Sequence, residues 1–199
     1  LHHGRPLGGL HLNMIGRHNV LNSLAVAALA DEIPVAFEIV QEAFEQFQGV
    51  QRRFTVRGQA RGVTVVDDYG HHPEEIKTTL DGAKRAHHRR TVVVFQPHRY
   101  TRLSLLMDSF ATAFNQADVL VVTEIYPAGE TPIPGITGRA LYEAVRQFGH
   151  KNVHFEANLK KVPALIKRLA RPGDIVLAQG AGNITRIVSE IVASLEEKS

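Results

Sequence analysis

Short apolar runs alternate with amphipathic stretches along most of the chain, and this alternation predicts the fold. Three runs are rich in β-branched residues, apolar throughout and bounded by polar residues, as strands buried on both faces of a sheet should be. These central parallel strands are predicted at Thr91–Phe95, Asp118–Thr123 and Asp174–Ala178. Shorter strands are expected at Val63–Val66 and Val153–Phe155, and Phe54–Gly58 alternates as an edge strand or hairpin partner does.

The stretches between these strands carry apolar residues at helical spacing. In the last segment, one apolar helix face consists of Ile184, Ile187, Val188, Ile191, Val192 and Leu195. Similar faces predict helices over residues 101–116 and 137–149, and a further helix is expected from Pro73, which the first turn tolerates, to about His88. Because strands and helices alternate from residue 54 onward, we expect an α/β fold, a mostly parallel sheet with helices on both faces.

The first fifty residues follow a different pattern. Two helices, Asn19–Ala30 and Val35–Phe47, are separated by residues 31–34 and preceded by at most one or two short strands. Two helices and a strand cannot enclose a hydrophobic core by themselves. We therefore interpret residues 1–53 as the end of a domain whose beginning is missing, and residues 54–199 as a complete domain.

Composition narrows the function classes. The 199 residues are 44% hydrophobic and 22% charged, as in globular proteins, and the net charge is +3. The basic residues are interleaved with acidic ones, so we expect no nucleic-acid partner and favour a small anionic ligand. The absence of cysteine excludes a disulfide scaffold and thiol chemistry. No apolar run approaches the roughly 18 residues of a membrane span, so we expect no membrane partner and a cytoplasmic protein.

Polar residues gather where four of the predicted strands end. In open parallel sheets, ligands bind outside the carboxyl ends of the strands, where loops converge and helix N-termini point. The residues that follow the four strands are Asp67, Asp68, Tyr69, His71 and His72; Gln96, His98, Arg99 and Arg102; Glu124, Tyr126 and Glu130; and Gln179 to Asn183. We expect the loops that carry them to form one site.

These clusters also have interpretations without a ligand. Arg99 and Arg102 could grip one anion if they lie on the first turn of a helix, or they could be unrelated surface arginines. One of the two aspartates could cap the helix that begins at Pro73 as readily as bind a ligand. The Gly180-Ala181-Gly182 segment allows close approach of a ligand, but such a pair of glycines often marks only a tight turn.

Two asparagines stand at the start of the first predicted helix. Asn19 and Asn22 are three residues apart, so both carboxamides can face one way and present the donor and acceptor edges that suit a purine. Asn19 could equally be an ordinary N-cap.

Several segments together resemble the Mur ligase family of ATP-dependent amide-bond ligases. They occur in the family's order and cover essentially the whole chain. The segments are Gly16-Arg17-His18-Asn19-x-x-Asn22, Gly49-Val50-Gln51-Arg52-Arg53-Phe54, Asp67-Asp68-Tyr69-Gly70-His71-His72-Pro73, residues 95–102 with the sequence Phe-Gln-Pro-His-Arg-Tyr-Thr-Arg, and Gly180-Ala181-Gly182-Asn183-Ile184. They are more similar to the members that attach L-alanine than to those that add later residues or recycle murein peptides.

The resemblance implies a three-domain enzyme. Residues 1–53 would be the tail of the central ATP-binding domain, and residues 54–199 the Rossmann-like C-terminal domain that binds the amino acid. The implied reaction joins L-alanine to UDP-N-acetylmuramate through an acyl phosphate in peptidoglycan synthesis, with ATP and Mg as cofactors. The implied partners are these small molecules and the remaining domains of the same enzyme.

The resemblance also implies roles for individual residues. Asn19 and Asn22 would contact adenine, Arg53 a nucleotide phosphate, and Asp67 or Asp68 the nucleotide. The expected residues of the amino-acid and phosphate site are Tyr69, His71, His98, Arg99 and Arg102, of which all but Tyr69 are expected to be catalytic.

The sequence departs from the family in two respects. The glycine-rich phosphate loop and the central-domain Glu and His that hold magnesium are absent from it, so we expect the chain to be inactive alone and to supply no metal ligand. Asn183 stands where the family usually has an acid, and we expect it to keep a helix-capping role without the charge. The alternatives are a stand-alone nucleotide-binding module, supported by Gly180–Gly182, and a metallohydrolase built on His71, His72 and His98.

Overall fold

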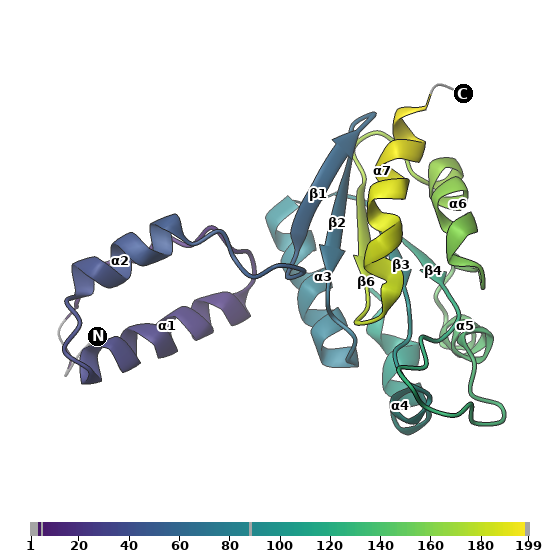
Figure 1. Ribbon diagram of the computed structural model, residues 1–199, viewed down its shortest axis with the longest axis horizontal. Helices are drawn as coiled ribbons and strands as arrows, with labels where there is room; N and C mark the ends of the chain where they lie inside the picture. Colours follow the sequence, from purple (N-terminus) through teal and green to yellow (C-terminus); the bar gives the residue numbers. More distant parts are fainter. Residues whose placement is uncertain (1–3, 5, 88, 198–199) are drawn as a thin grey trace. The chain divides into compact units, whose positions relative to one another are not determined.

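The computed structural model describes residues 4, 6–87 and 89–197. The chain forms two compact units, Leu1–Val50 and Gln51–Ser199, and each is described by itself. The second unit contains a six-stranded sheet of order β1-β2-β6-β3-β4-β5 (Figure 1). The strands are β1 (Thr55–Ala60), β2 (Val63–Asp68), β3 (Thr91–Phe95), β4 (Val119–Val122), β5 (Val153–Phe155) and β6 (Ile175–Gln179).

The strand pairing confirms the predicted fold class. β1 pairs with β2 as an antiparallel hairpin, and every other pair is parallel. The three strands predicted to be central, β6, β3 and β4, are central, because their side chains are apolar on both faces and need cover from two helical layers.

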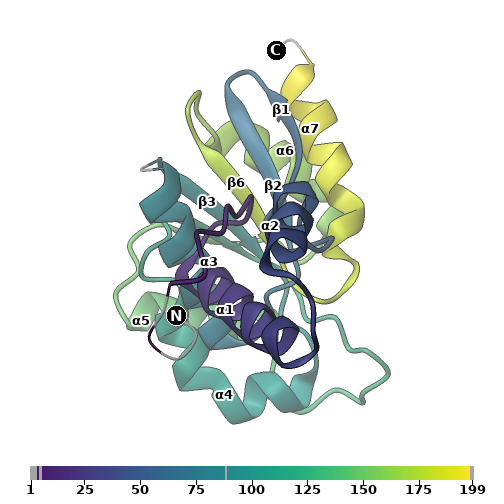
Figure 2. The same cartoon turned by 90° about the vertical axis from the view of Figure 1, so that its left-hand side faces the viewer.

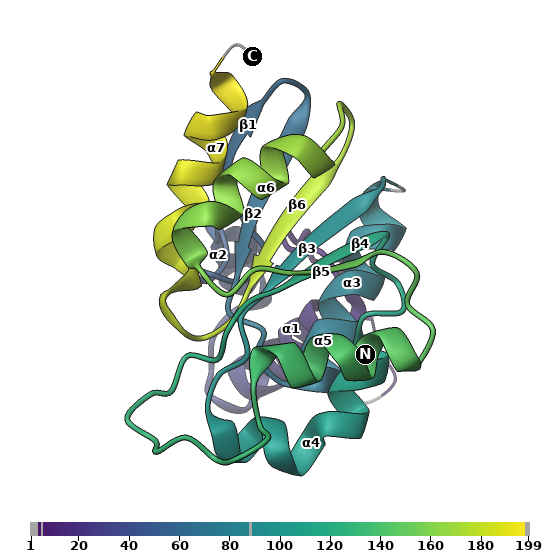
Figure 3. The ribbon, with the colours of Figure 1, turned by 90° about the vertical axis from the view of Figure 1, so that its right-hand side faces the viewer.

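Helices cover both faces of the sheet (Figures 2 and 3). On one face lie α3 (Pro73–His87), α4 (Tyr100–Ala113) and α5 (Gly138–Gln147); on the other lie α6 (Val162–Leu169), preceded by the 3₁₀ turn η1 (Leu159–Lys161), and α7 (Val188–Glu196). His88, the predicted end of the third helix, lies outside the described residues. None of the helices in the described part of the chain is both long and apolar enough to cross a bilayer.

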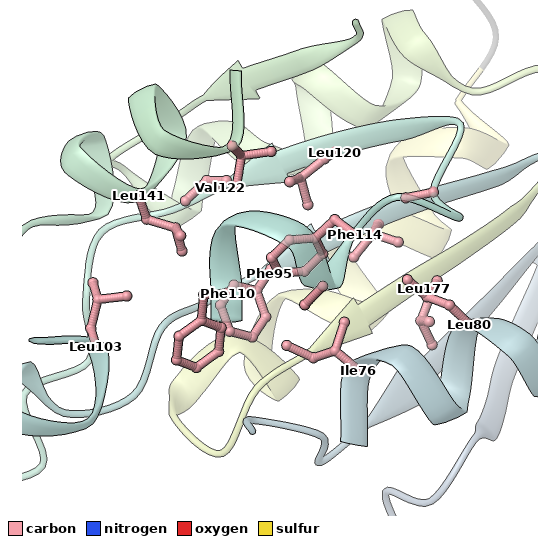
Figure 4. Close-up of a cluster of buried hydrophobic side chains, with 14 of the residues drawn as sticks. Ile76, Leu80, Phe95, Leu103, Phe110, Phe114, Leu120, Val122, Leu141 and Leu177 are labelled. Atoms are coloured by element: carbon pink, nitrogen blue, oxygen red, sulfur yellow. The ribbon is translucent and has the colours of Figure 1, made fainter. Parts of the chain in front are cut away.

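Each central strand contributes to two hydrophobic cores. Val92 and Val94 of β3 face the α6–α7 layer, whereas Val93 and Phe95 face the α3–α5 layer. The Phe95 ring centroid lies 5.6 Å from that of Phe110 and 5.0 Å from that of Phe114 (Figure 4). Burial of such side chains stabilises the unit by about 1.5–3 kcal/mol each. The strand ends that carry the site residues are therefore held by a rigid framework.

Two predicted helix boundaries are wrong in the second unit. The last segment does not begin as an α-helix at Ile184: residues Asn183–Ile187 form a 3₁₀ turn, η2, and α7 starts at Val188. Ile184 and Ile187 are buried in either geometry, so periodicity could not separate the two. The helix predicted over 101–116 is shorter and has non-helical φ and ψ angles at Leu106.

The first unit consists of two helices, α1 (Arg17–Glu32) and α2 (Phe37–Gln46), joined by a short turn (Figure 1). In the described residues before Arg17 there is no strand. Within this unit several large apolar side chains are exposed, among them Leu24 at 56%, Leu29 at 62% and Ile39 at 59%. As the sequence predicts, the two helices do not enclose a core of their own.

Candidate functional site

The strand order brings four polar loops together. β6, the last strand in sequence, lies between β2 and β3, so the chain leaves β2 toward α3 on one face and leaves β6 toward η2 and α7 on the other. Connections that diverge in this way mark the place, at the carboxyl ends of the strands, where open α/β sheets bind ligands. The loops that follow β2, β6, β3 and β4 all begin at this edge, because the four strands are parallel.

Four aromatic rings form a continuous row across these loops. The Tyr69 and His71 rings meet edge to face with centroids 5.1 Å apart, and the His71 and His98 centroids lie 5.8 Å apart. The His98 ring stacks on Tyr126 at 5.6 Å. Thus Tyr69, His71 and His98, from two different strand ends, lie in one place, and Tyr126 extends the row to a third.

His98 has a defined tautomer. The Arg102 Nη1 atom lies 3.2 Å from His98 Nδ1 and donates to the His98 carbonyl at 3.3 Å. Because a guanidinium can only donate, Nδ1 must accept, and the neutral ring carries its proton on Nε2. Burial lowers the pKa of His98, and the nearby charges of Arg102, His71 and Arg99 lower it further, against a small opposing effect of Glu130. His98 therefore offers an Nε2–H donor at neutral pH.

His71 has the opposite tautomer. Its Nδ1 lies 3.0 Å from the Tyr69 carbonyl oxygen and 3.5 Å from a carboxylate oxygen of Glu75, and both of these can only accept. In neutral His71 the proton is therefore on Nδ1, and Nε2 has a free lone pair. The two histidines supply a donor and an acceptor side by side.

Arg99 and Arg102 stand at the start of α4 but have different partners. Arg102 is hydrogen-bonded to His98. The Arg99 side chain is half exposed, and its Nη1 lies 3.9 Å from a carboxylate oxygen of Glu130. Arg99 precedes the first residue of the helix and has a φ of 71°. Two cationic groups thus flank the row of rings, in keeping with capture of an anion.

Asp68 is fully engaged with the protein. Its carboxylate accepts from the backbone N–H groups of Phe54 at 2.9 Å and Gly70 at 2.8 Å, and from the Gln179 amide at 3.1 Å. Asp67 is also buried; it accepts from the Thr185 hydroxyl at 2.7 Å and lies 3.5 Å from Arg52 Nε. These bonds join the ends of β2 and β6, and the nucleotide contact expected of this pair stays a prediction.

Neither aspartate occupies the N-terminal turn of α3. The N–H groups of His71 and His72 donate to Glu75 Oε2 at 2.9 and 3.1 Å. Burial would raise the pKa of Glu75, but these two bonds and the charges of His71 and Arg53 outweigh it and lower that pKa. The capping alternative for Asp67 or Asp68 is replaced by a cap from Glu75, within the helix.

Two consecutive arginines border the site beside β1. Arg52, to which the sequence assigned no role, donates to the Gly180 carbonyl at 2.5 Å and lies over the Tyr69 ring at 4.9 Å. Arg53 lies 3.5 Å from Glu75 and is half exposed, so its guanidinium remains available to an anion. No sequence spacing indicates the Arg52 contacts, since Gly180 is 128 residues away.

The glycines after β6 serve packing. A Cβ on Gly180 would lie 2.8 Å from the Gln96 carbonyl oxygen, and one on Gly182 would lie 2.5 Å from Gln96 Oε1 and 2.7 Å from Tyr126. Close packing against Gln96 and Tyr126 accounts for both glycines, so they give no separate support to the alternative of a nucleotide-binding module.

Asn183 does not cap a helix. It is the first residue of η2, whose N-cap is Gly182, and its Oδ1 accepts from Gln96 Nε2 at 2.8 Å. Gln96 Oε1 in turn accepts from the Ile184 N–H at 3.0 Å. The Gln96 side chain takes the capping role that the sequence assigned to Asn183. An aspartate could accept the same bond, so loss of the acid leaves this link intact.

The two predicted adenine-contacting residues lie on α1 in the first unit. The N-cap of α1 is Gly16, so Asn19 is inside the helix and its N-cap interpretation is wrong. Its side-chain amide donates to the Ile15 carbonyl at 2.7 Å. Asn22 is exposed three residues further along the same helix. The adenine contacts of both stay predictions.

The described side chains at the strand ends do not form a metal-binding cluster. Among the described residues, no group of three or more His, Cys, Asp or Glu side chains is placed to hold a metal ion. His71 and His98 use their Nδ1 atoms in bonds to protein atoms. This arrangement gives the metallohydrolase alternative no support.

Comparison with known families assigns the chain. Residues 52–182 match the family described as "Mur ligase, glutamate ligase domain". The chain belongs to the Mur ligase family. Among curated proteins it is 57% identical over 191 residues to the UDP-N-acetylmuramate–L-alanine ligase of Anaeromyxobacter sp. (strain Fw109-5), and 51% identical over 199 residues to that of Sorangium cellulosum (strain So ce56).

Solved Mur ligases share the fold. The UDP-N-acetylmuramate–alanine ligase of Thermotoga maritima superposes with a TM-score of 0.78 at 34% identity, covering 92% of this chain and 39% of that one. A murein peptide ligase from Psychrobacter arcticus gives 0.72 at 26% identity, covering 96% of this chain and 39% of that one. The two curated matches include 96% and 98% of this chain. The chain itself spans only 42% of the length of each relative.

Proposed function

We propose that this chain forms the C-terminal part of an ATP-dependent ligase that joins L-alanine to UDP-N-acetylmuramate, and that the side chains gathered at the strand ends hold the alanine. In this proposal residues 1–53 are the tail of the ATP-binding domain and residues 54–199 the amino-acid-binding domain. The supporting observation is that Tyr69, His71, His98 and Arg102 form one connected cluster in a chain 57% identical to such a ligase.

The cluster suits the second half of the proposed reaction. The UDP-N-acetylmuramate carboxylate first takes the γ-phosphoryl group of ATP and becomes an acyl phosphate. The alanine amine then attacks the carbonyl carbon, the bond to phosphate breaks, and the amide nitrogen loses a proton. Holding the two reactants at attack distance supplies much of the rate enhancement of such a step.

The residues divide this work by their chemistry. Arg99 and Arg102 are suited to hold the alanine carboxylate and to offset the charge of the acyl phosphate. His98 donates from Nε2 in its neutral form, so it orients an oxygen of the acyl phosphate and does not take the amine proton there. Neutral His71, with a free Nε2 lone pair, is the better proton acceptor.

ATP and Mg enter this proposal through the rest of the enzyme. Arg53, with a half-exposed guanidinium, fits a contact to nucleotide phosphate, and Asn19 and Asn22 are proposed to contact adenine. The ligands of the magnesium ion are proposed to lie outside this sequence.

The test is steady-state kinetics of the full-length ligase that carries this sequence. We expect Arg102→Ala to raise the KM for L-alanine or lower kcat by about 10- to 150-fold, the value of a charge-assisted hydrogen bond, with the KM for ATP within about twofold. Arg85→Ala is the matched control, because Arg85 is exposed on α3 and pairs with Asp81 away from the strand ends. Wild-type kinetics in both Arg102→Ala and Arg99→Ala would refute the assignment.

A further inference from the structure

The start of α4 needs an acceptor that its own sequence does not supply. Arg99, the N-cap residue, makes no side-chain cap and has a φ of 71°, a conformation that costs an L residue about 1–3 kcal/mol. The first N–H groups of a helix have no partner within it. The surroundings must therefore hold both the strained residue and the first turn.

Glu130 supplies this acceptor from a loop beyond β4. Its Oε2 accepts from the Thr101 N–H at 3.0 Å, and its Oε1 accepts from the Thr101 hydroxyl at 2.6 Å. Two backbone hydrogen bonds hold the same loop beside the turn. The Tyr126 carbonyl accepts from the Arg99 N–H at 2.9 Å, and the Tyr126 N–H donates to the Pro97 carbonyl at 2.8 Å. A carboxylate at this position also suits the positive end of the helix.

Glu130 is also the partner of the Arg99 side chain. The bonds from the Thr101 hydroxyl and N–H, with a smaller effect of Arg99, lower the pKa of Glu130, so it is charged at neutral pH. Its separation of 3.9 Å from Arg99 is a loose contact, and half of the Arg99 side chain is exposed. Ion pairs of this kind are weak in water, so a second carboxylate can compete for the guanidinium.

We propose that Glu130 is a positioning residue for amino-acid binding: it fixes the first turn of α4 and holds Arg99 where the substrate carboxylate meets it. Both Glu130 oxygens accept hydrogen bonds from Thr101, and Oε1 lies 3.9 Å from Arg99. In this proposal Glu130 therefore acts through the helix start and Arg99, without touching the substrate. This inference rests on the proposed function, in which Arg99 binds the alanine carboxylate.

A double-mutant cycle in the full-length ligase tests the proposal. Glu130→Gln keeps the size and one acceptor but removes the charge. We expect it to raise the KM for L-alanine about 3- to 10-fold and to leave the KM for ATP and UDP-N-acetylmuramate within about twofold. In the Arg99→Ala background the same change is expected to have a smaller effect, because only its action on the first turn of α4, which carries Arg102, remains. Glu143→Gln, on the exposed surface of α5, is the control, and Thr101→Val is expected to reproduce part of the effect.

The outcomes separate the two proposals. If Arg99→Ala leaves the KM for L-alanine unchanged, the assignment of Arg99 under the proposed function fails. If Arg99→Ala raises that KM but Glu130→Gln does not, positioning by Glu130 is refuted. It is equally refuted if Glu130→Gln acts by the same factor in both backgrounds, or if it raises all three KM values together as a general loss of folding would.

Discussion

At the scale of single residues, hydrogen-bond partners give two identical side chains different chemistry. His98 Nδ1 faces a guanidinium that can only donate, whereas His71 Nδ1 faces a carbonyl and a carboxylate that can only accept. One ring is thereby a donor at Nε2 and the other an acceptor. Neither role follows from the sequence. The partners lie within four residues of each histidine, but spacing alone does not show which ring nitrogen faces them.

The His98 tautomer leads to a titration prediction. Burial and the charge of Arg102 are the two largest effects that lower the pKa of His98. We expect ¹⁵N NMR of the ring to show Nδ1 unprotonated at pH 7, a pKa below 6.5, and a higher pKa in Arg102→Met. A pKa at or above 6.5 in the unmodified protein would contradict the proposed bond.

The same shift has a definite sign for stability. The unfolded chain binds a proton at His98 near pH 6.5, and the folded protein binds it only at lower pH. The unfolded state therefore binds more protons in this interval, and the His98 contribution to the free energy of unfolding falls as the pH drops from above 6.5 toward the folded pKa.

At the scale of secondary-structure elements, one amide side chain joins two strand exits. Gln96 follows β3, and its Nε2 and Oε1 bond to Asn183 and to the Ile184 N–H of η2, which follows β6. Because Gln96 is buried, these bonds are shielded from water. The link holds the 3₁₀ turn against the end of β3, at the edge of the sheet that carries the candidate site.

This link predicts a contrast between two substitutions. Gln96→Leu leaves the Ile184 N–H and the Asn183 carboxamide without their partner, so we expect a loss of about 2–4 kcal/mol in the free energy of unfolding. Asn183→Asp keeps an acceptor for Gln96 and should change that free energy by less than about 1 kcal/mol. Urea denaturation of the 199-residue chain measures both. Similar losses in the two variants would contradict the role given to Gln96.

The elements also show how far the sequence could predict the molecule. The buried strands and most helices were identified because their apolar periodicity is strong, and the grouping of Tyr69, His71 and His98 followed from the rule for strand ends. The capping role of Asn19 was wrong because α1 begins at Arg17, with Gly16 as its N-cap. That of Asn183 was wrong because a distant side chain reaches the first turn of η2. Gln96 and Glu130 take such roles across 88 and 29 residues of sequence.

At the scale of the whole molecule, the two units differ in how completely they bury their apolar residues. The second has two cores separated by a sheet, whereas α1 and α2 leave Leu24, Leu29 and Ile39 exposed within their unit. This contrast supports our proposal that residues 1–53 are part of a larger domain.

The most direct test of the account is the structure of the full-length ligase with UDP-N-acetylmuramoyl-L-alanine, the proposed product, bound. We expect the alanine carboxylate to lie within hydrogen-bonding distance of the Arg99 or Arg102 guanidinium, with the new amide beside His71 and His98. An alanine carboxylate bound at the opposite edge of the sheet, or on α6 and α7, would contradict it.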